Sequence, residues 1–170
     1  MNKDENTQQA EVPFRGFRGI LAVCLGNICR SPAAEGILKA MVERQGKSHE
    51  FFIDSAGLLD YHEGSLPDNR MRQSASKRNY VLDSRSRPVV QEDFKKFDYL
   101  LAMDKSVFRS LERMANSEAE RKKIYMMTDF LSKYNYDEIP DPYYGSEKGF
   151  ELVIDLLEDA CTGFLEKINE

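Results

Sequence analysis

The stretch Cys24-Leu25-Gly26-Asn27-Ile28-Cys29-Arg30-Ser31-Pro32 decides how this chain folds. A short apolar run rich in branched residues leads into it from Gly19 and indicates a buried strand that stops at Gly26. Pro32 suits the first turn of a helix, where its missing N–H leaves no hydrogen bond unmade. Apolar residues then recur at helical spacing, and Gly46 is a plausible helix stop. The stretch is therefore predicted to be a strand-to-helix loop.

The rest of the chain repeats this alternation of strands and helices. Further strands are predicted at 51–53, 99–103 and 124–127, and helical patterns at 68–78, around Val107 to Met114, and from Val153 to Ile168. A loop with two prolines spans 132–146. We expect an α/β fold: a single-domain, three-layer α/β/α arrangement around a central four-stranded parallel, Rossmann-like sheet. In such sheets, sites form beyond the carboxyl ends of the strands, which is where the loop after the first strand lies.

Length and composition limit the possible classes of protein. A chain of 170 residues with 41% hydrophobic residues is one domain's length, and we assign residues 17–170 to that domain. Residues 1–16 are predicted to be a disordered extension, because their first part is polar and resembles no secretory signal. With no membrane-spanning run, we expect a cytoplasmic protein, and the small size favours a monomer.

Charge and cysteine content exclude several kinds of partner. The formal net charge of −5 argues against a nucleic-acid partner and requires a local field to attract any anionic substrate. Three cysteines are too few for a disulfide scaffold, and with only His49 and His62 as histidines a zinc site is not expected. We predict no metal and no cofactor, and we expect neither histidine to have a role.

The strand-to-helix loop has the composition of an anion site. Its backbone N–H groups can turn inward as a concave nest, and the helix adds its positive N-terminal end. Gly26 and Asn27 permit the tight path, and the planar fork of Arg30 matches two phosphate oxygens. The same field would favour the thiolate of Cys24, to which Ser31 could donate a hydrogen bond. A lone cysteine at a strand end is usually a small buried side chain, but these residues together in one loop favour a catalytic reading.

The loop resembles the phosphate-binding loop of the low-molecular-weight protein tyrosine phosphatases, in its pattern Cys-x5-Arg-Ser. A second family mark is Asp141-Pro142-Tyr143-Tyr144-Gly145, which resembles the general-acid loop. The segments DSAG at 54–57 and FDYLLAMD at 97–104 are also similar to family segments. The resemblance runs from Gly19 to Ile168, so it covers nearly the whole chain outside the extension.

The resemblance implies roles for individual residues. Cys24 would be the nucleophile, Arg30 would bind phosphate together with the loop (Leu25, Gly26, Asn27, Ile28, Cys29 and Ser31), and Asp141 would be the general acid and then base. Protonating a phenolate, whose conjugate acid has a pKa of about 10, lowers the barrier to P–O cleavage. Without the resemblance, Asp141 next to proline would be interpreted as an ordinary turn residue.

Other residues take supporting roles by the same resemblance. Tyr143 and Tyr144 would wall the entrance, with Tyr61 on the opposite side; each could equally be a packing residue. Cys29 would trap an oxidised Cys24 as a reversible disulfide, making the enzyme redox-regulated, unless it is simply a small buried side chain. Cys161 is read as core. Where many eukaryotic members have a histidine, this chain has Asn79, expected to hydrogen-bond with Asn27, Ser31 and Ser55 behind the loop.

These roles predict a protein tyrosine phosphatase that acts on phosphotyrosine-containing proteins. Protein-arginine phosphatases of the same family are one alternative; they carry a threonine before the second cysteine, where Ile28 here suits an aromatic substrate. Arsenate reductases share the fold but need further cysteines for a disulfide relay. A phosphotyrosine-binding module without activity would need neither the thiolate nor the acid. The protein's substrate and pathway cannot be named from the sequence.

Overall fold

The central sheet consists of four parallel strands in the order β2-β1-β3-β4. The computed structural model describes residues 16–170, so the predicted extension lies outside the described residues apart from Gly16. The strands are β1 (Arg18–Cys24), β2 (Phe51–Gly57), β3 (Tyr99–Ala102) and β4 (Ile124–Met126). Strand β1 pairs with β2 on one side and β3 on the other, so the loop that follows it lies in the middle of the carboxyl edge.

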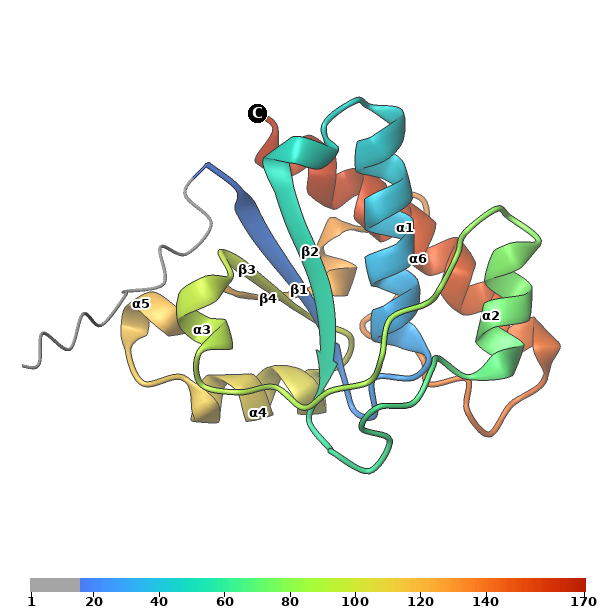
Figure 1. The fold of residues 1–170 in the computed structure, drawn as a ribbon, viewed down its shortest axis with the longest axis horizontal. Helices are drawn as coiled ribbons and strands as arrows, with labels where there is room; N and C mark the ends of the chain where they lie inside the picture. Colours follow the sequence, from blue (N-terminus) through green and yellow to red (C-terminus); the bar gives the residue numbers. More distant parts are fainter. Residues whose placement is uncertain (1–15) are drawn as a thin grey trace, which may run out of the picture.

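Helices cover both faces of this sheet, as Figure 1 shows. Along β1, the side chains of Ile20, Ala22 and Cys24 join one buried cluster, while Leu21 and Val23 join another on the opposite face. The first cluster includes residues of α1 (Arg30–Arg44), α2 (Asn69–Ser76) and α6 (Glu147–Ile168), and the second includes residues of α3 (Asp93–Lys96) and α4 (Lys105–Met114). Because a strand buried on both faces reads as a continuous apolar run, this arrangement explains the sequence from Gly19. The predicted three-layer α/β/α fold is confirmed.

Element ends differ from the predictions in ways that short-range signals explain. Strand β2 continues through Gly57, and the helix predicted at 68–78 covers 69–76, with Asp68 as its N-cap. The four-residue helices α3 and α5 (Glu118–Arg121) were not predicted, nor were the 3₁₀ turns η1 (Ser48–Glu50) and η2 (Met127–Phe130). Each is too short to show a helical period.

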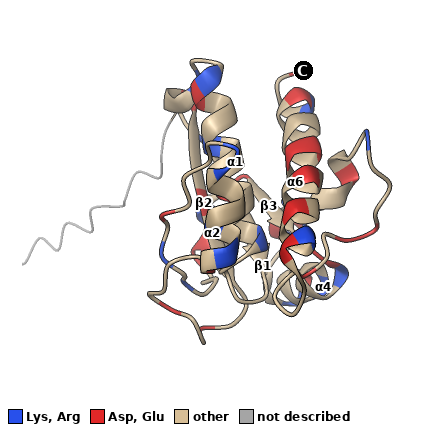
Figure 2. Ribbon diagram, turned by 90° about the vertical axis from the view of Figure 1, so that its right-hand side faces the viewer, with Lys and Arg blue, Asp and Glu red and all other residues tan. Residues whose placement is uncertain are grey.

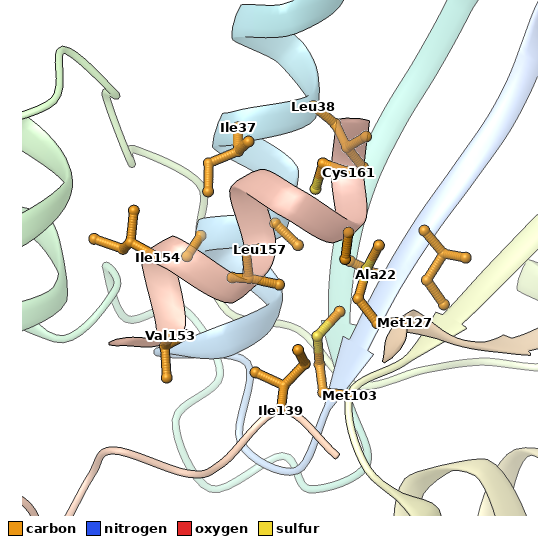
Figure 3. Packing of buried hydrophobic residues seen from close by; sticks show 14 of the residues in the cluster. Ala22, Ile37, Leu38, Met103, Met127, Ile139, Val153, Ile154, Leu157 and Cys161 are labelled. Atoms are coloured by element: carbon orange, nitrogen blue, oxygen red, sulfur yellow. The ribbon is translucent and has the colours of Figure 1, made fainter. Parts of the chain in front are cut away.

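The cluster on the α1 and α6 side is closely packed. Figure 3 shows Cys161 of α6 facing Leu38 of α1, and Cys161 is fully buried, which confirms that it belongs to the core. The outer face of α6 is acidic (Figure 2), and Arg78, just after α2, makes ion pairs with three of its carboxylates, Glu151, Asp155 and Glu158. These contacts fix α2 against α6. None of the helices in residues 16–170 is long and apolar enough to cross a membrane.

Candidate active site

The loop after β1 is held against the end of β2. The backbone N–H groups of Leu58 and Leu59 donate to the carbonyls of Cys24 and Leu25 at 3.1 and 3.0 Å. A Cβ on Gly57 would lie 3.0 Å from the backbone N of Asn27 and from its Cβ, which is closer than nine in ten real Cβ contacts. The last residue of the DSAG segment must therefore be glycine, so that the second strand can approach the loop.

The loop itself presents unpaired backbone donors. Asn27 adopts a left-handed φ of +56° while 2% exposed, and its N–H donates to the Cys24 sulfur at 3.2 Å. Within the described residues, the N–H groups of Gly26, Ile28, Cys29 and Arg30 donate to no protein acceptor. Helix α1 begins here without a side-chain cap and without an acidic residue in its first turn. The loop thus surrounds Cys24 with open donors and a positive helix end, which together attract an anion.

A chain of buried hydrogen bonds supports the loop from behind. The Asn27 amide donates to Ser31 Oγ at 2.8 Å and to Ser55 Oγ at 3.0 Å, and Ser55 donates to Glu35 Oε1 at 2.6 Å. Ser31 Oγ lies 3.0 Å from the Cys24 sulfur. Because Ser31 Oγ already accepts from Asn27, its own hydrogen can go to the sulfur or to the Ala56 carbonyl 3.4 Å away. The two side chains expected from the sequence to hydrogen-bond are therefore within hydrogen-bonding distance.

Arg30, the first residue of α1, is 3% exposed and held on one side only. Its Nη1 donates to Asp104 Oδ2 at 2.8 Å and to the Ile139 carbonyl at 3.0 Å, while Nε and Nη2 make no hydrogen bond within residues 16–170. Burial alone would lower the pKa of Arg30, but its electrostatic interaction with the neighbouring Cys24 and the hydrogen bond to Asp104 raise it. The guanidinium therefore keeps its charge and one free edge, enough for two phosphate oxygens.

Asp141 stands at the mouth of the same site. Its side chain is 44% exposed, and Oδ2 lies 3.9 Å from Arg30 Nη2. Oδ1 accepts the backbone N–H of Tyr143 at 3.1 Å, which fixes the carboxylate in a local turn. Upstream, the N–H of buried Ile139 donates to the Met103 carbonyl at 2.8 Å, just beyond β3. The loop that bears Asp141 is thus anchored to the sheet two residues before the carboxylate.

These groups meet in one pocket of about 360 Å³. Tyr61 and Tyr144 are 83% and 94% exposed and stand at its rim, and Tyr143 forms an edge contact with Tyr144 at 4.9 Å between ring centroids. The full lining consists of Cys24, Leu25, Gly26, Ile28, Cys29, Arg30, Leu59, Tyr61, His62, Asp141, Tyr143 and Tyr144. The structure therefore brings Tyr61, Tyr143 and Tyr144 together with the loop and Asp141, as the sequence led us to expect.

His62, for which we expect no role, lines the pocket, with its ring beside Gly26 and edge-on to Tyr61 at 4.8 Å between ring centroids. The expectation for Asn79 is wrong. Asn79, expected behind the loop, is exposed just beyond α2, and within residues 16–170 no hydrogen bond joins it to Asn27 or the two serines. Its left-handed φ of +66° turns the chain there, so that Tyr80, not Asn79, points inward. Glu35 occupies the end of the network instead.

Glu35 and Asp104 are the residues that the sequence reasoning missed. Glu35 is a charged residue on the buried side of α1, next to Ala34, and a carboxylate in such a place signals a polar partner. Asp104 ends the FDYLLAMD segment, to which the sequence assigns no chemical role; it caps α4 through the N–H of Val107 at 2.8 Å and holds Arg30. Cys29 is buried beside Cys24, and burial, with Asp68 nearby, raises the pKa of its thiol well above the ordinary value.

Comparison with known proteins gives consistent matches over most of the chain. The family model described as low molecular weight phosphotyrosine protein phosphatase matches residues 19–170. A crystal structure of a protein tyrosine phosphatase from Entamoeba histolytica is 47% identical, with a TM-score of 0.87, and the match covers 89% of this chain and 97% of that one. The low molecular weight phosphotyrosine protein phosphatase of Gallus gallus is 38% identical over 153 residues, 88% of this chain and 95% of that protein.

An arginine phosphatase is also among the similar structures. The Drosophila arginine phosphatase DARP is 29% identical with a TM-score of 0.83, and the match covers 91% of this chain and 99% of that one. Similarity of fold alone therefore leaves the phosphorylated amino acid open.

Proposed function

The chain belongs to the low-molecular-weight phosphotyrosine protein phosphatase family, and we propose that it hydrolyses phosphotyrosine in proteins through a phosphocysteine intermediate on Cys24. One observation carries this proposal: the Cys24 sulfur lies in a ring of unpaired backbone N–H groups, beside the free edge of Arg30. Asp141 Oδ2 lies 3.9 Å from the same guanidinium. A nucleophile, an anion site and an acid thus meet in one pocket.

In the proposed first step, the Cys24 thiolate attacks phosphorus in line with the tyrosine oxygen. The S–P bond forms as the P–O bond breaks, and the proton of Asp141 passes to the departing phenol oxygen. The loop N–H groups and the Nε and Nη2 of Arg30 donate to the equatorial oxygens of the phosphoryl group. These donors stabilise the transition state because they are already oriented toward its negative charge. Ser31 stabilises the thiolate before attack and again after it leaves.

In the second step, water replaces the cysteine. The water oxygen bonds to phosphorus as the P–S bond breaks, and the water proton returns to Asp141, which restores the acid. The positive charge at the site is supplied by Arg30 and the end of α1, so the mechanism includes no step that needs a metal ion.

The pocket walls favour a phenyl ring over a guanidinium group as the leaving group. Ile28 presents an aliphatic side chain to the pocket, and Tyr143 and Tyr144 face the mouth, where a flat ring can pack between aromatic edges. A phosphoarginine side chain would place a planar cation there, with no acidic side chain other than Asp141 among the residues that line the pocket. This observation favours phosphotyrosine over phosphoarginine, the substrate of the family's arginine phosphatases.

Hydrolysis of matched phosphotyrosine, phosphoserine and phosphoarginine peptides, without added metal, tests the proposal. We expect turnover of phosphotyrosine to exceed that of the other two by about 10²-fold or more, since only a phenol suits both the pocket and the acid. Cys24→Ser should abolish turnover but still bind phosphate, because the loop donors and Arg30 remain. Faster hydrolysis of phosphoarginine, or turnover by Cys24→Ser near the wild-type rate, would show that the substrate or the nucleophile is wrongly assigned.

A further inference from the structure

Arg70, in the first turn of α2, is fixed to the phosphate-binding loop. Its Nε and Nη2 donate to the two carboxylate oxygens of Asp68 at 3.1 and 2.9 Å. The backbone N–H of Asp68 donates in turn to the Ile28 carbonyl at 2.8 Å. A bidentate pair of this kind fixes the plane of the guanidinium as well as its position. The orientation of Arg70 is therefore set, through Asp68, by the loop that would hold the phosphate.

The other side of Arg70 contacts the segment that bears the acid. The guanidinium carbon lies 5.4 Å from the ring centroid of Tyr143 and 4.8 Å from that of Phe150 in α6. Cations over aromatic faces at these distances are attracted by the ring. Phe150 is fully buried, so Arg70 is held against the core while it contacts Tyr143. The backbone N–H of Tyr143 is the group that holds Asp141 Oδ1.

We propose that Arg70 is a positioning residue that sets the distance between the general acid and the phosphate-binding loop, acting through Tyr143. This inference rests on the proposed phosphatase function. Upstream, the acid is tied to the sheet by Ile139; downstream, Pro142 is buried, but the chain from Tyr144 to Lys148 is exposed. Arg70 adds support to this segment from the side of the phosphate loop, so that the exposed carboxylate keeps a fixed place above the nucleophile.

A positioning role predicts an effect that depends on the leaving group. Without Arg70, Tyr143 loses its charged support and Asp141 spends less time in reach of the leaving oxygen. A small misplacement of a catalytic group costs up to about 10²-fold, and we expect Arg70→Gln to lower kcat/KM about tenfold for an ester of a weakly acidic phenol. An ester of a strongly acidic phenol needs little protonation, so its kcat/KM should change less than about twofold.

Arg72 provides a matched control on the same helix. It is exposed, carries the same charge two residues further on, and has no ion pair or side-chain hydrogen bond with the described residues. Arg72→Gln should leave both rates unchanged, which excludes a general effect of net charge. Arg70→Lys should recover only part of the loss, because an ammonium group keeps the cation over the rings but cannot bond both oxygens of Asp68. Thermal unfolding of each variant confirms that the fold is intact.

A double-mutant cycle with Tyr143→Leu tests whether Arg70 acts through the tyrosine. Tyr143→Leu should produce a leaving-group dependence of its own. In the Tyr143→Leu background, Arg70→Gln should lower kcat/KM by less than about a further twofold, because Arg70 can no longer act through Tyr143. Full additivity, or an equal loss for both esters in Arg70→Gln, would overturn the inference by showing that Arg70 acts on substrate binding or on the phosphate loop. Failure of the wild-type protein to hydrolyse either ester would instead refute the proposed function, so the two failures are distinct.

Discussion

Replacing Asp141 with asparagine should separate chemistry from binding, because the proposed acid also carries a negative charge next to Arg30. Asparagine keeps the shape of the side chain and an Oδ1 that can still accept the N–H of Tyr143, a bond of 3.1 Å in this protein. It loses the proton that the leaving group needs, and it loses the negative charge 3.9 Å from Arg30 Nη2. The local turn should therefore survive while both electrostatic functions are removed.

The two losses act in opposite directions. Loss of a general acid slows cleavage of a poor leaving group by about 10²–10⁴-fold. Loss of the charge removes a repulsion toward the incoming phosphate. Two unit charges about 4 Å apart in water interact by about 1 kcal/mol, and the half-exposed carboxylate justifies the water-like value. Inorganic phosphate should therefore inhibit the Asp141→Asn variant about fivefold more strongly than the wild-type protein.

The assay must resolve the first step from the second, because Asp141 is assigned to both. Rapid mixing with two aryl phosphates, one with a strongly acidic phenol and one with a weakly acidic phenol, gives the burst rate of phenol release. We expect the burst to slow severely only for the weakly acidic phenol, and the phosphocysteine to accumulate with the other. If both burst rates fell equally, or if phosphate bound more weakly, Asp141 could not be the acid beside the phosphate site.

Further predictions concern the supports of the site. Asp104→Asn should lower the free energy of unfolding by about 1.5–3 kcal/mol, because the charged hydrogen bond to Arg30 is lost. Asp104→Ala should lower it by about 1 kcal/mol more, because alanine also removes the N-cap of α4. Urea unfolding of both variants measures the difference. Peroxide should inactivate the wild-type protein reversibly, with recovery in thiol, and Cys29→Ser should recover less; equal recovery would exclude a Cys24–Cys29 disulfide. Burial alone would raise the pKa of Asp159, but hydrogen bonds from the loop after η2 lower it. A lowered pKa stabilises the fold above the unfolded value of about 3.9, so Asp159→Asn should be less stable than wild type at pH 7, with the gap narrowing as the pH falls below about 4.

The parts of the site that could be predicted from the sequence are those that are local in the chain. Cys24, the glycine turn, Arg30 and the helix start stand within nine consecutive residues, 24–32, and the apolar run before them specifies a strand. Given a parallel sheet, the position of this loop at the carboxyl edge follows without knowledge of the strand order. The assignment of Asp141 as the acid required the family resemblance, because an aspartate next to proline carries no chemical signal of its own.

The parts that escaped prediction depend on contacts between distant residues. Asp104 and Arg30 are 74 positions apart and meet because β3 pairs with β1, an order that local periodicity does not contain. His62 lies in an irregular loop that places its ring next to Gly26, a contact that no local sequence pattern contains. Asn79 was placed by alignment with a histidine, yet the left-handed turn after α2 directs the chain away from the network.

The hydrogen-bond network behind Cys24 is oriented by Asn27. The amide of Asn27 can only donate from its nitrogen, so Ser31 and Ser55 must both accept there and pass their own hydrogens onward. Ser55 passes its hydrogen to Glu35, and Ser31 can pass its hydrogen to Cys24. No member of this chain is an imidazole, whose charge would change between about pH 5 and 8. The orientation of the network is therefore fixed by the Asn27 amide, and no imidazole titration can reverse it.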